Sequence, residues 1–239
     1  MTLLRRQIQS VFIMGIEIYN KTIRPEIRGV LFDMDGLVLD TEKLYSRFWM
    51  KACHFYGFPM TYAQSLQMRA ANSRLGAERL CHFFGPGANY TTIRNKRIEL
   101  MDAFIEEQGV EPKPGIFELL EVLEKQKIPA AITSSSPADR IKSHLSSLGL
   151  YHRFAAICSG HDVPRGKPAP DIYLLGAASL GLPPEQCLAL EDAPLGIESA
   201  FRAGCTPIMI PDLDQPEEAT CSMLYAKADS LLDIIQLLR

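Results

Sequence analysis

The stretch that decides the fold is Val30-Leu31-Phe32-Asp33-Met34-Asp35-Gly36, in which three apolar residues lead directly to a carboxylate. A short, continuous apolar run is typical of a strand that is buried on both faces, as in a parallel sheet. The polar residues that follow would then lie at the carboxyl end of that strand. Gly36 allows a sharp turn at this point, because glycine adopts backbone conformations that other residues avoid.

Four further apolar runs share this arrangement, since each is followed by polar residues that could take part in chemistry. They are 128–132 before Thr133–Ser136, 154–157 before Gly166-Lys167-Pro168, 187–190 before Glu191-Asp192, and 207–210 before Pro211-Asp212. We interpret all of them as strands of one sheet.

Helical patterns separate these runs. Apolar residues recur at helical spacing from Ile116 to Leu123, and a second stripe follows Ser136, which we expect to cap a helix with Pro137 at its first position. Three glycines are expected to end helices: Gly149, Gly181 and Gly204. Strands that alternate with helices predict an α/β protein with a doubly wound, mostly parallel sheet.

The segment 43–109 interrupts this alternation. It contains helical stripes but no convincing strand, and it is divided by the turn signals Gly57-Phe58-Pro59 and Gly85-Pro86-Gly87. We therefore predict an all-helical insert, with Pro112–Gly115 as the hinge back into the rest of the chain.

The remaining residues define the other predicted parts of the chain. The core domain is expected to comprise 28–42 and 110–239. Residues 1–27 are expected to be an N-terminal leader outside the core, or a segment in which translation begins at Met14.

Composition narrows the classes of function. The chain has 239 residues, 25 basic and 28 acidic side chains and a net charge of -3, with no basic stripe for nucleic acid and no polybasic membrane patch. Its six cysteines show no CxxC spacing, so we predict neither a zinc site nor a disulfide framework. We expect a cytoplasmic protein that acts as a monomer on a small molecule.

Several polar side chains should meet at one edge of the sheet. Ligands bind at the carboxyl ends of the strands in open parallel sheets. Different strands deliver Asp33, Ser134, Lys167 and Glu191-Asp192 to this edge. Three carboxylates at one place would repel one another unless a cation were present, and hard oxygen ligands suit Mg²⁺.

These residues resemble the four motifs of the haloacid dehalogenase-like hydrolases. The segment Asp33–Glu42 is similar to the first motif, and Ser134 after Ala131-Ile132-Thr133 to the second. Lys167 within 166–173 is similar to the third motif, and Glu191–Ile197 to the fourth. The four occur in order, and the resemblance extends from about Arg28 to the end of the chain.

The resemblance implies a Rossmann-like core with a helical cap inserted after the first motif. It implies that Asp33 attacks phosphorus and forms an aspartyl-phosphate. Asp35 would protonate the leaving oxygen and then activate water. Mg²⁺ would be held by the Asp33 carboxylate, the Asp35 carbonyl and Asp192, with Glu191 bound directly or in the next layer. The phosphate would be held by Gly36, Ser134, Ser135 and Lys167.

The resemblance is greater to one branch of the family, which contains β-phosphoglucomutases, sugar-phosphate phosphatases and pseudouridine-5'-phosphate phosphatases. Mutases of this branch usually have a histidine where Tyr45 stands, and a Lys-Gly-x-Ser-Arg segment where this chain has Arg69–Arg74. Both differences favour a phosphatase. The candidates for substrate binding in the cap are Tyr45, Arg69, Asn72 and Arg74.

Three functions remain to be distinguished. The first is a phosphatase for a small sugar or nucleoside phosphate. The second is a β-phosphoglucomutase-type isomerase, in which a sugar hydroxyl rather than water takes the phosphate from Asp33. The third is a non-catalytic binding module, against which the complete set of motif residues argues.

Overall fold

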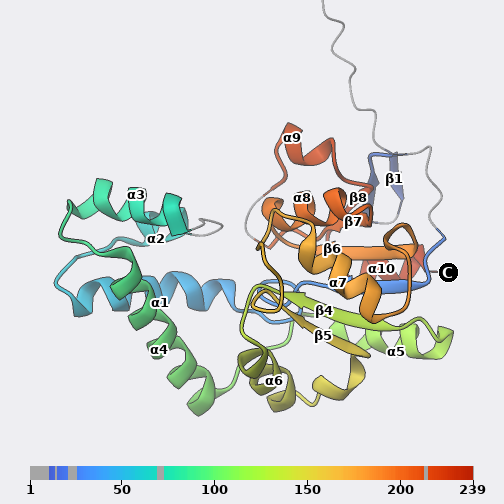
Figure 1. Cartoon of the computed structure of the whole chain (residues 1–239), viewed down its shortest axis with the longest axis horizontal. Helices are drawn as coiled ribbons and strands as arrows, with labels where there is room; N and C mark the ends of the chain where they lie inside the picture. Colours follow the sequence, from blue (N-terminus) through green and yellow to red (C-terminus); the bar gives the residue numbers. More distant parts are fainter. Residues whose placement is uncertain (1–10, 14, 21–25, 69–72, 213–214, 239) are drawn as a thin grey trace, which may run out of the picture. The chain divides into compact units, whose positions relative to one another are not determined.

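The computed structural model describes residues 11–13, 15–20, 26–68, 73–212 and 215–238, and these include a sheet flanked by helices (Figure 1). In these residues the sheet has eight strands in the order β1-β2-β8-β7-β6-β3-β4-β5. Their bounds are Val11–Ile13 (β1), Ile16–Ile18 (β2), Gly29–Phe32 (β3), Ala130–Ser134 (β4), Ala156–Ser159 (β5), Cys187–Glu191 (β6), Thr206–Met209 (β7) and Ala226–Ala228 (β8). All neighbours from β8 to β5 are parallel, which confirms the predicted fold class.

The central strands are buried along their whole length. Every residue of β3, β4, β6 and β7 is buried, as expected for strands covered on both faces. Strand β5 is an edge strand of the sheet and begins two residues after the start of its apolar run, at Ala156 rather than at Phe154. Assignments of element ends commonly differ by one or two residues.

Helices connect the parallel strands, and a last helix follows β8. Their bounds in the core are Ile116–Gln126 (α5), Ala138–Ser147 (α6), Asp171–Ser179 (α7), Pro194–Ala203 (α8), Glu218–Cys221 (α9) and Leu231–Leu237 (α10). Helices α7 and α8 pack against each other on one side of the sheet, whereas α5 and α6 lie on the other side (Figure 1). The helices cover both faces of the sheet because the crossovers are right-handed. A crossover that runs one way along the sheet places its helix on one face, and a crossover that runs the other way places its helix on the opposite face.

The strand order places a switch point beside β3. The chain moves from β3 outward to β4 and β5, and then returns to β6 on the other side of β3. Loops on the two sides of this point lead away from each other, which leaves a space at the carboxyl ends of the strands. The ends of β3, β4 and β6 are therefore the part of the sheet where a ligand site is expected.

Residues Leu39–Glu111 form a separate compact unit, and the remainder of the chain forms the other. The described residues of this unit contain four helices and no strand, with bounds Glu42–Phe55 (α1), Tyr62–Gln67 (α2), Ser73–Phe84 (α3) and Tyr90–Gln108 (α4). It has its own apolar core around Trp49, Leu80 and Ile93. The Thr61 side chain caps α2 through a reciprocal capping box with Gln64.

The N-terminal segment contributes strands that the sequence analysis did not expect. Within the segment interpreted as a leader, β1 and β2 form an antiparallel pair, and β2 pairs with β8. Lys227 of β8 approaches Glu17 of β2 at 3.6 Å, and the Tyr19 hydroxyl donates to Glu17 at 2.9 Å. These short strands cover what would otherwise be an open sheet edge at β8.

Ile16 provides a test of this N-terminal pairing. Its side chain is 1% exposed although it lies in a three-residue strand. We expect Ile16→Ala to lower the free energy of unfolding by about 2–5 kcal/mol, the usual cost of emptying a buried isoleucine site. Urea unfolding followed by circular dichroism measures this, with the exposed Leu174→Ala of α7 as the control. Equal midpoints for Ile16→Ala and wild type would show that these strands add nothing to stability.

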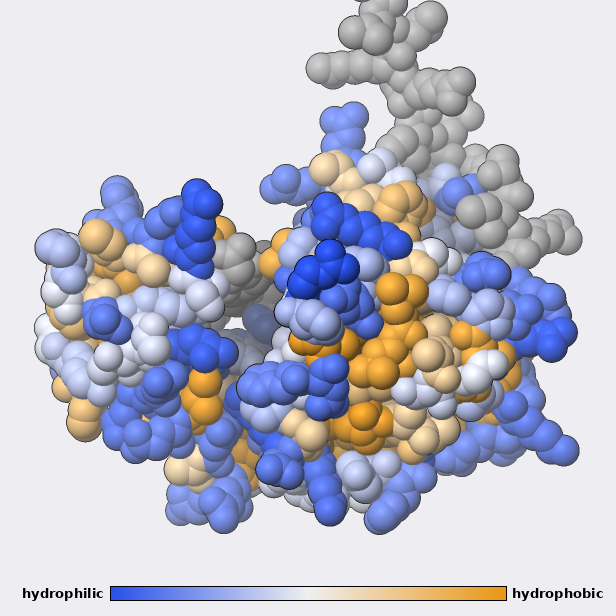
Figure 2. All heavy atoms as spheres, viewed as in Figure 1, coloured by the Kyte–Doolittle hydropathy of each residue, from blue (hydrophilic) through white to orange (hydrophobic). Residues whose placement is uncertain are grey.

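The surface carries both polar and apolar areas. Hydrophilic side chains cover much of the face seen in Figure 2, and apolar surface gathers around α7 of the unit that contains the sheet. Among the described residues, no helix combines the length and the apolar character that crossing a membrane requires.

Candidate active site

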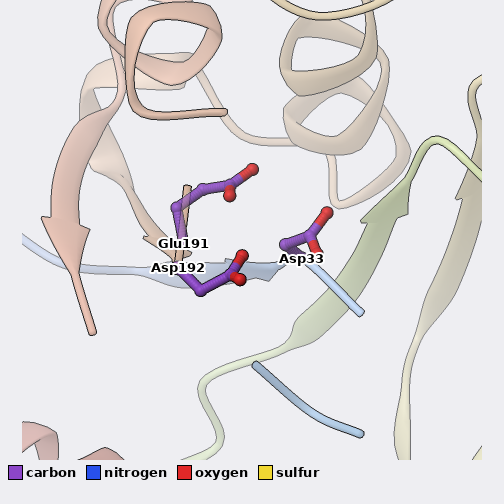
Figure 3. A group of neighbouring side chains, drawn as sticks. All are labelled: Asp33, Glu191 and Asp192. Atoms are coloured by element: carbon purple, nitrogen blue, oxygen red, sulfur yellow. The ribbon is translucent and has the colours of Figure 1, made fainter. Parts of the chain in front are cut away.

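Three carboxylates from two adjacent strands converge at the switch point (Figure 3). Asp33 directly follows β3, Glu191 is the last residue of β6, and Asp192 comes next. The Asp33 backbone N–H donates to the Leu190 carbonyl at 3.0 Å, so the parallel pairing continues up to the site. Asp33 is 8% exposed and Glu191 is 1% exposed, so both carboxylates are held in a largely dry environment.

Lys167 connects two of these carboxylates. Its ammonium donates to Asp33 Oδ1 at 2.5 Å and to Glu191 Oε1 at 2.6 Å. The loop that carries Lys167 is anchored to α8, because the Ser199 hydroxyl donates to the Ala169 carbonyl at 2.5 Å. The structure thus brings together three of the residues that the sequence placed on different strands.

Burial and charge oppose each other at this ion pair. Burial raises the pKa of the Asp33 carboxyl to about 7, although the Lys167 ammonium acts in the opposite direction. Burial also disfavours the charged form of Lys167, but Asp33 and Glu191 outweigh this effect and raise the pKa of Lys167 above its usual range. A further positive charge beside Asp33 would favour the ionised carboxylate that a nucleophile requires.

The acidic group has the composition of a site for a hard cation. Asp33, Glu191 and Asp192 each offer a carboxylate oxygen, and these oxygens lie within 4.8 Å of one another. Asp35 lies two residues beyond Asp33, and its Oδ1 atom is buried without a hydrogen bond in the described structure. Several carboxylate oxygens near one point, with no nitrogen or sulfur ligand, fit Mg²⁺.

The serines after β4 have different environments. Ser134 is 1% exposed and its hydroxyl oxygen accepts from the Ser136 backbone N–H at 3.1 Å, whereas Ser135 is exposed. The Ser136 hydroxyl donates to Asp35 Oδ2 at 3.1 Å. The prediction that Ser136 caps the following helix is wrong, because α6 begins at Ala138 with Pro137 in the N-cap position. Ser136 instead orients Asp35.

Gly36 occupies a conformation that few other residues adopt. Its φ angle is 88°, within the left-handed region that favours glycine, and it lies in the turn directly after Asp35. The expected turn after the first strand is therefore present.

Tyr173 is a site residue that the sequence analysis left without a role. It is the third residue of α7 and is completely buried, and its hydroxyl donates to Glu191 Oε1 at 2.5 Å. Its place in the third motif put it near Lys167, but no spacing rule connects it to Glu191, which lies 18 positions further along the chain. The same holds for Ser136 and Asp35, which are 101 positions apart.

The candidates for substrate binding lie in the helical unit. Tyr45 of α1 packs its ring against the guanidinium of the buried Arg97, 4.6 Å from the ring centroid. Arg74 of α3 is exposed and pairs with Glu78 at 3.0 Å. Arg69 and Asn72 lie outside the described residues. The role of these four side chains stays a prediction.

The fold and the site together define an enzyme of the α/β class with an acidic centre at the carboxyl edge of a Rossmann-like sheet. The sequence profile of the family described as haloacid dehalogenase-like hydrolases matches residues 30–210. The chain belongs to this family, as its four motifs indicated.

Two proteins named as phosphatases and one solved structure are among those similar to this chain. A Drosophila melanogaster protein named "Probable pseudouridine-5'-phosphatase" is 32% identical over 209 residues, covering 84% of this chain and 88% of that protein. "Hexitol phosphatase A" of Escherichia coli (strain K12) is 33% identical over 186 residues, covering 77% and 82%. The structure of a "putative beta-phosphoglucomutase" from Thermotoga maritima has a TM-score of 0.73 and 26% identity, covering 89% and 98%.

Proposed function

We propose that this protein is a Mg²⁺-dependent phosphatase that hydrolyses a small phosphate monoester of a sugar or nucleoside through an aspartyl-phosphate. The observation that carries the proposal is the bridge from Lys167 to Asp33 and Glu191, with Asp192 completing an acidic group at the switch point. Relatives whose names describe phosphatases of sugar and nucleoside phosphates support the choice of substrate class.

The reaction divides into two displacements. An oxygen of Asp33 forms a bond to phosphorus while the bond from phosphorus to the ester oxygen breaks, and Asp35 gives its proton to the leaving alcohol. Asp35 then takes a proton from water, whose oxygen attacks phosphorus and releases inorganic phosphate from Asp33. The Ser136 hydroxyl, which donates to Asp35, helps to hold that side chain in place.

The remaining motif residues bind the phosphoryl group and the cation. Ser134, Ser135, Gly36 and Lys167 are proposed to hold the phosphoryl oxygens, since phosphoryl transfer depends mainly on positioning and on stabilising charge. Asp33, Asp192 and the Asp35 carbonyl would hold Mg²⁺, with Glu191 close by. The cation, when bound, supplies charge that offsets the repulsion between the nucleophile and the phosphate.

The helical unit is proposed to select the substrate. We assign 43–109 as a cap on a core formed by 28–42 and 110–239, with Tyr45, Arg69, Asn72 and Arg74 as the candidates for contact with the leaving group. A cap that closes would exclude bulk water during the transfer. The six cysteines are all free, which suits a cytoplasmic protein. We expect a monomer that binds neither nucleic acid nor membranes.

The proposal is tested by measuring phosphate release with Mg²⁺ across a panel of sugar and nucleoside monophosphates. β-Glucose-1-phosphate is included, and its conversion to glucose-6-phosphate is followed in parallel. Steady release of phosphate from a member of the panel supports a phosphatase. Isomerisation with little free phosphate, stimulated by traces of bisphosphate, would show that the mutase function is correct. The likeness to the Thermotoga maritima structure keeps that alternative in the test.

Cation binding has a separate, physical readout. Because a ligand that binds only the folded state stabilises it, Mg²⁺ at about 100 times its Kd should add about 2.7 kcal/mol to the free energy of unfolding. We expect the melting temperature to rise with Mg²⁺ and the rise to be lost in Asp192→Asn. Differential scanning calorimetry measures this, with Glu118→Gln at an exposed position of α5 as the control. The same Mg²⁺ response in Asp192→Asn and wild type would contradict the assigned ligand.

A further inference from the structure

We propose that Tyr173 is a positioning residue, whose hydroxyl fixes Glu191 so that Glu191 holds the Lys167 ammonium against Asp33. This inference rests on the proposed function, because it assigns a role in the same site. Tyr173 itself reaches the reacting atoms only through Glu191 and Lys167.

One oxygen of the Glu191 carboxylate accepts hydrogen bonds from both Tyr173 and Lys167. Glu191 Oε1 accepts a hydrogen bond from the Tyr173 hydroxyl at 2.5 Å and another from the Lys167 ammonium at 2.6 Å. The same ammonium also lies 5.2 Å from the centroid of the Tyr173 ring. Tyr173 therefore meets this ion pair twice, through its hydroxyl at the carboxylate and through its ring at the cation.

Helix α8 confines Glu191 from another direction. A Cβ atom added at Gly196, in the first turn of α8, would overlap the Glu191 carboxylate group. Only a residue without a side chain leaves space for the carboxylate at this position. Glu191 is thus enclosed by Tyr173 of α7, by Lys167, and by the backbone of α8.

This confinement has a consequence for Lys167. A lysine side chain has a flexible stem of four carbons and loses considerable freedom when it is fixed. A Glu191 carboxylate that is already fixed gives the ammonium one permanent partner, so its second contact is directed to Asp33. Pre-organisation of this kind lowers the barrier of the transfer more than it strengthens the binding of substrate.

The experiment is Tyr173→Phe, which removes only the hydroxyl. We expect kcat to fall about 10- to 100-fold, the range that corresponds to one lost hydrogen bond to a charged group, while KM changes by less than about threefold. The control is Tyr19→Phe, because the Tyr19 hydroxyl also donates to a glutamate, Glu17, but at the far edge of the sheet. A wild-type kcat in Tyr173→Phe, or an equal loss in Tyr19→Phe, would overturn the inference.

Gly196→Ala provides an independent route to the same group. The added methyl group would displace Glu191 and leaves the residues at positions 173 and 167 unsubstituted. We expect a loss of kcat similar to that of Tyr173→Phe. If both variants act by displacing Glu191, the double variant loses less than the product of the two single losses. A loss of kcat in the double variant equal to the product of the two single losses would contradict a shared mechanism. Thermal unfolding of each variant establishes that the folded protein is being compared.

The structural readout separates this inference from the proposed function. In a crystal structure of Tyr173→Phe, we expect the Lys167 ammonium to have lost its hydrogen bond to Asp33 or to Glu191. If the wild type hydrolyses no ester of the panel, the proposed function fails, and this crystal structure still decides the role of Tyr173. A Lys167 ammonium that keeps both contacts would overturn that role.

Discussion

Asp33→Asn is expected to reduce phosphate release at least about a thousandfold. An amide cannot form the covalent intermediate, and removal of the nucleophile from a covalent mechanism leaves only the contribution of binding and positioning. The effect should lie in kcat, measured by phosphate release under saturating substrate with Mg²⁺. Rapid quenching followed by peptide mass spectrometry should find a phosphorylated peptide containing Asp33 in wild type and none in the variant.

Two controls keep this result specific. Glu118→Gln makes the same exchange of carboxylate for amide at an exposed position of α5 and should retain wild-type turnover. The melting temperature of Asp33→Asn without Mg²⁺ should stay close to that of wild type, because the neutral amide removes the cost of burying a carboxylate but also gives up the ion pair with Lys167. Turnover within tenfold of wild type in Asp33→Asn would eliminate Asp33 as the nucleophile.

Asp35→Asn is expected to affect the two displacements differently. With an alkyl phosphate, whose leaving alcohol needs a proton, kcat should fall about 10²- to 10⁴-fold, the usual contribution of general acid–base catalysis. With p-nitrophenyl phosphate the leaving group departs without a proton, so the first step should remain fast. The second step still lacks its base, and the phosphorylated enzyme should accumulate.

Rapid mixing with p-nitrophenyl phosphate tests this assignment. Asp35→Asn should release about one nitrophenolate per enzyme in a burst and then continue slowly, and mass spectrometry should find the phosphoryl group on Asp33. Glu118→Gln and wild type should both release nitrophenolate at a steady rate without this burst. An equal loss on both esters, with no phosphorylated enzyme, would show that Asp35 does not act as the acid and base.

Local patterns were sufficient for much of the fold. Helix α8 runs from Pro194 to Ala203 and ends at Gly204, whose φ angle is 85°, because proline and glycine act on the few residues beside them. The strands β3, β4, β6 and β7 were found because strands buried on both faces contain continuous runs of apolar residues. The parallel order of these strands then placed Asp33 beside Glu191 and Asp192.

The three short strands at one side of the sheet could not be predicted from such patterns. Strands β1, β2 and β8 have only three residues each, too few to show a period, and they are held by pairing with one another and with β7. Ile16 looks like any apolar residue in the sequence, yet in the sheet it lies opposite Ala228 and is buried. The role of the N-terminal segment in the sheet was therefore missed.

The sequence by itself determined the α/β class, the helical insert and the set of polar residues that end the strands, because each depends on neighbours in the chain. Only the tertiary structure decided that Ser136 donates to Asp35 instead of capping α6, and that Tyr173 shares Glu191 with Lys167. Both are hydrogen bonds between distant segments, and a hydroxyl has no preferred partner until folding brings one within reach and removes water.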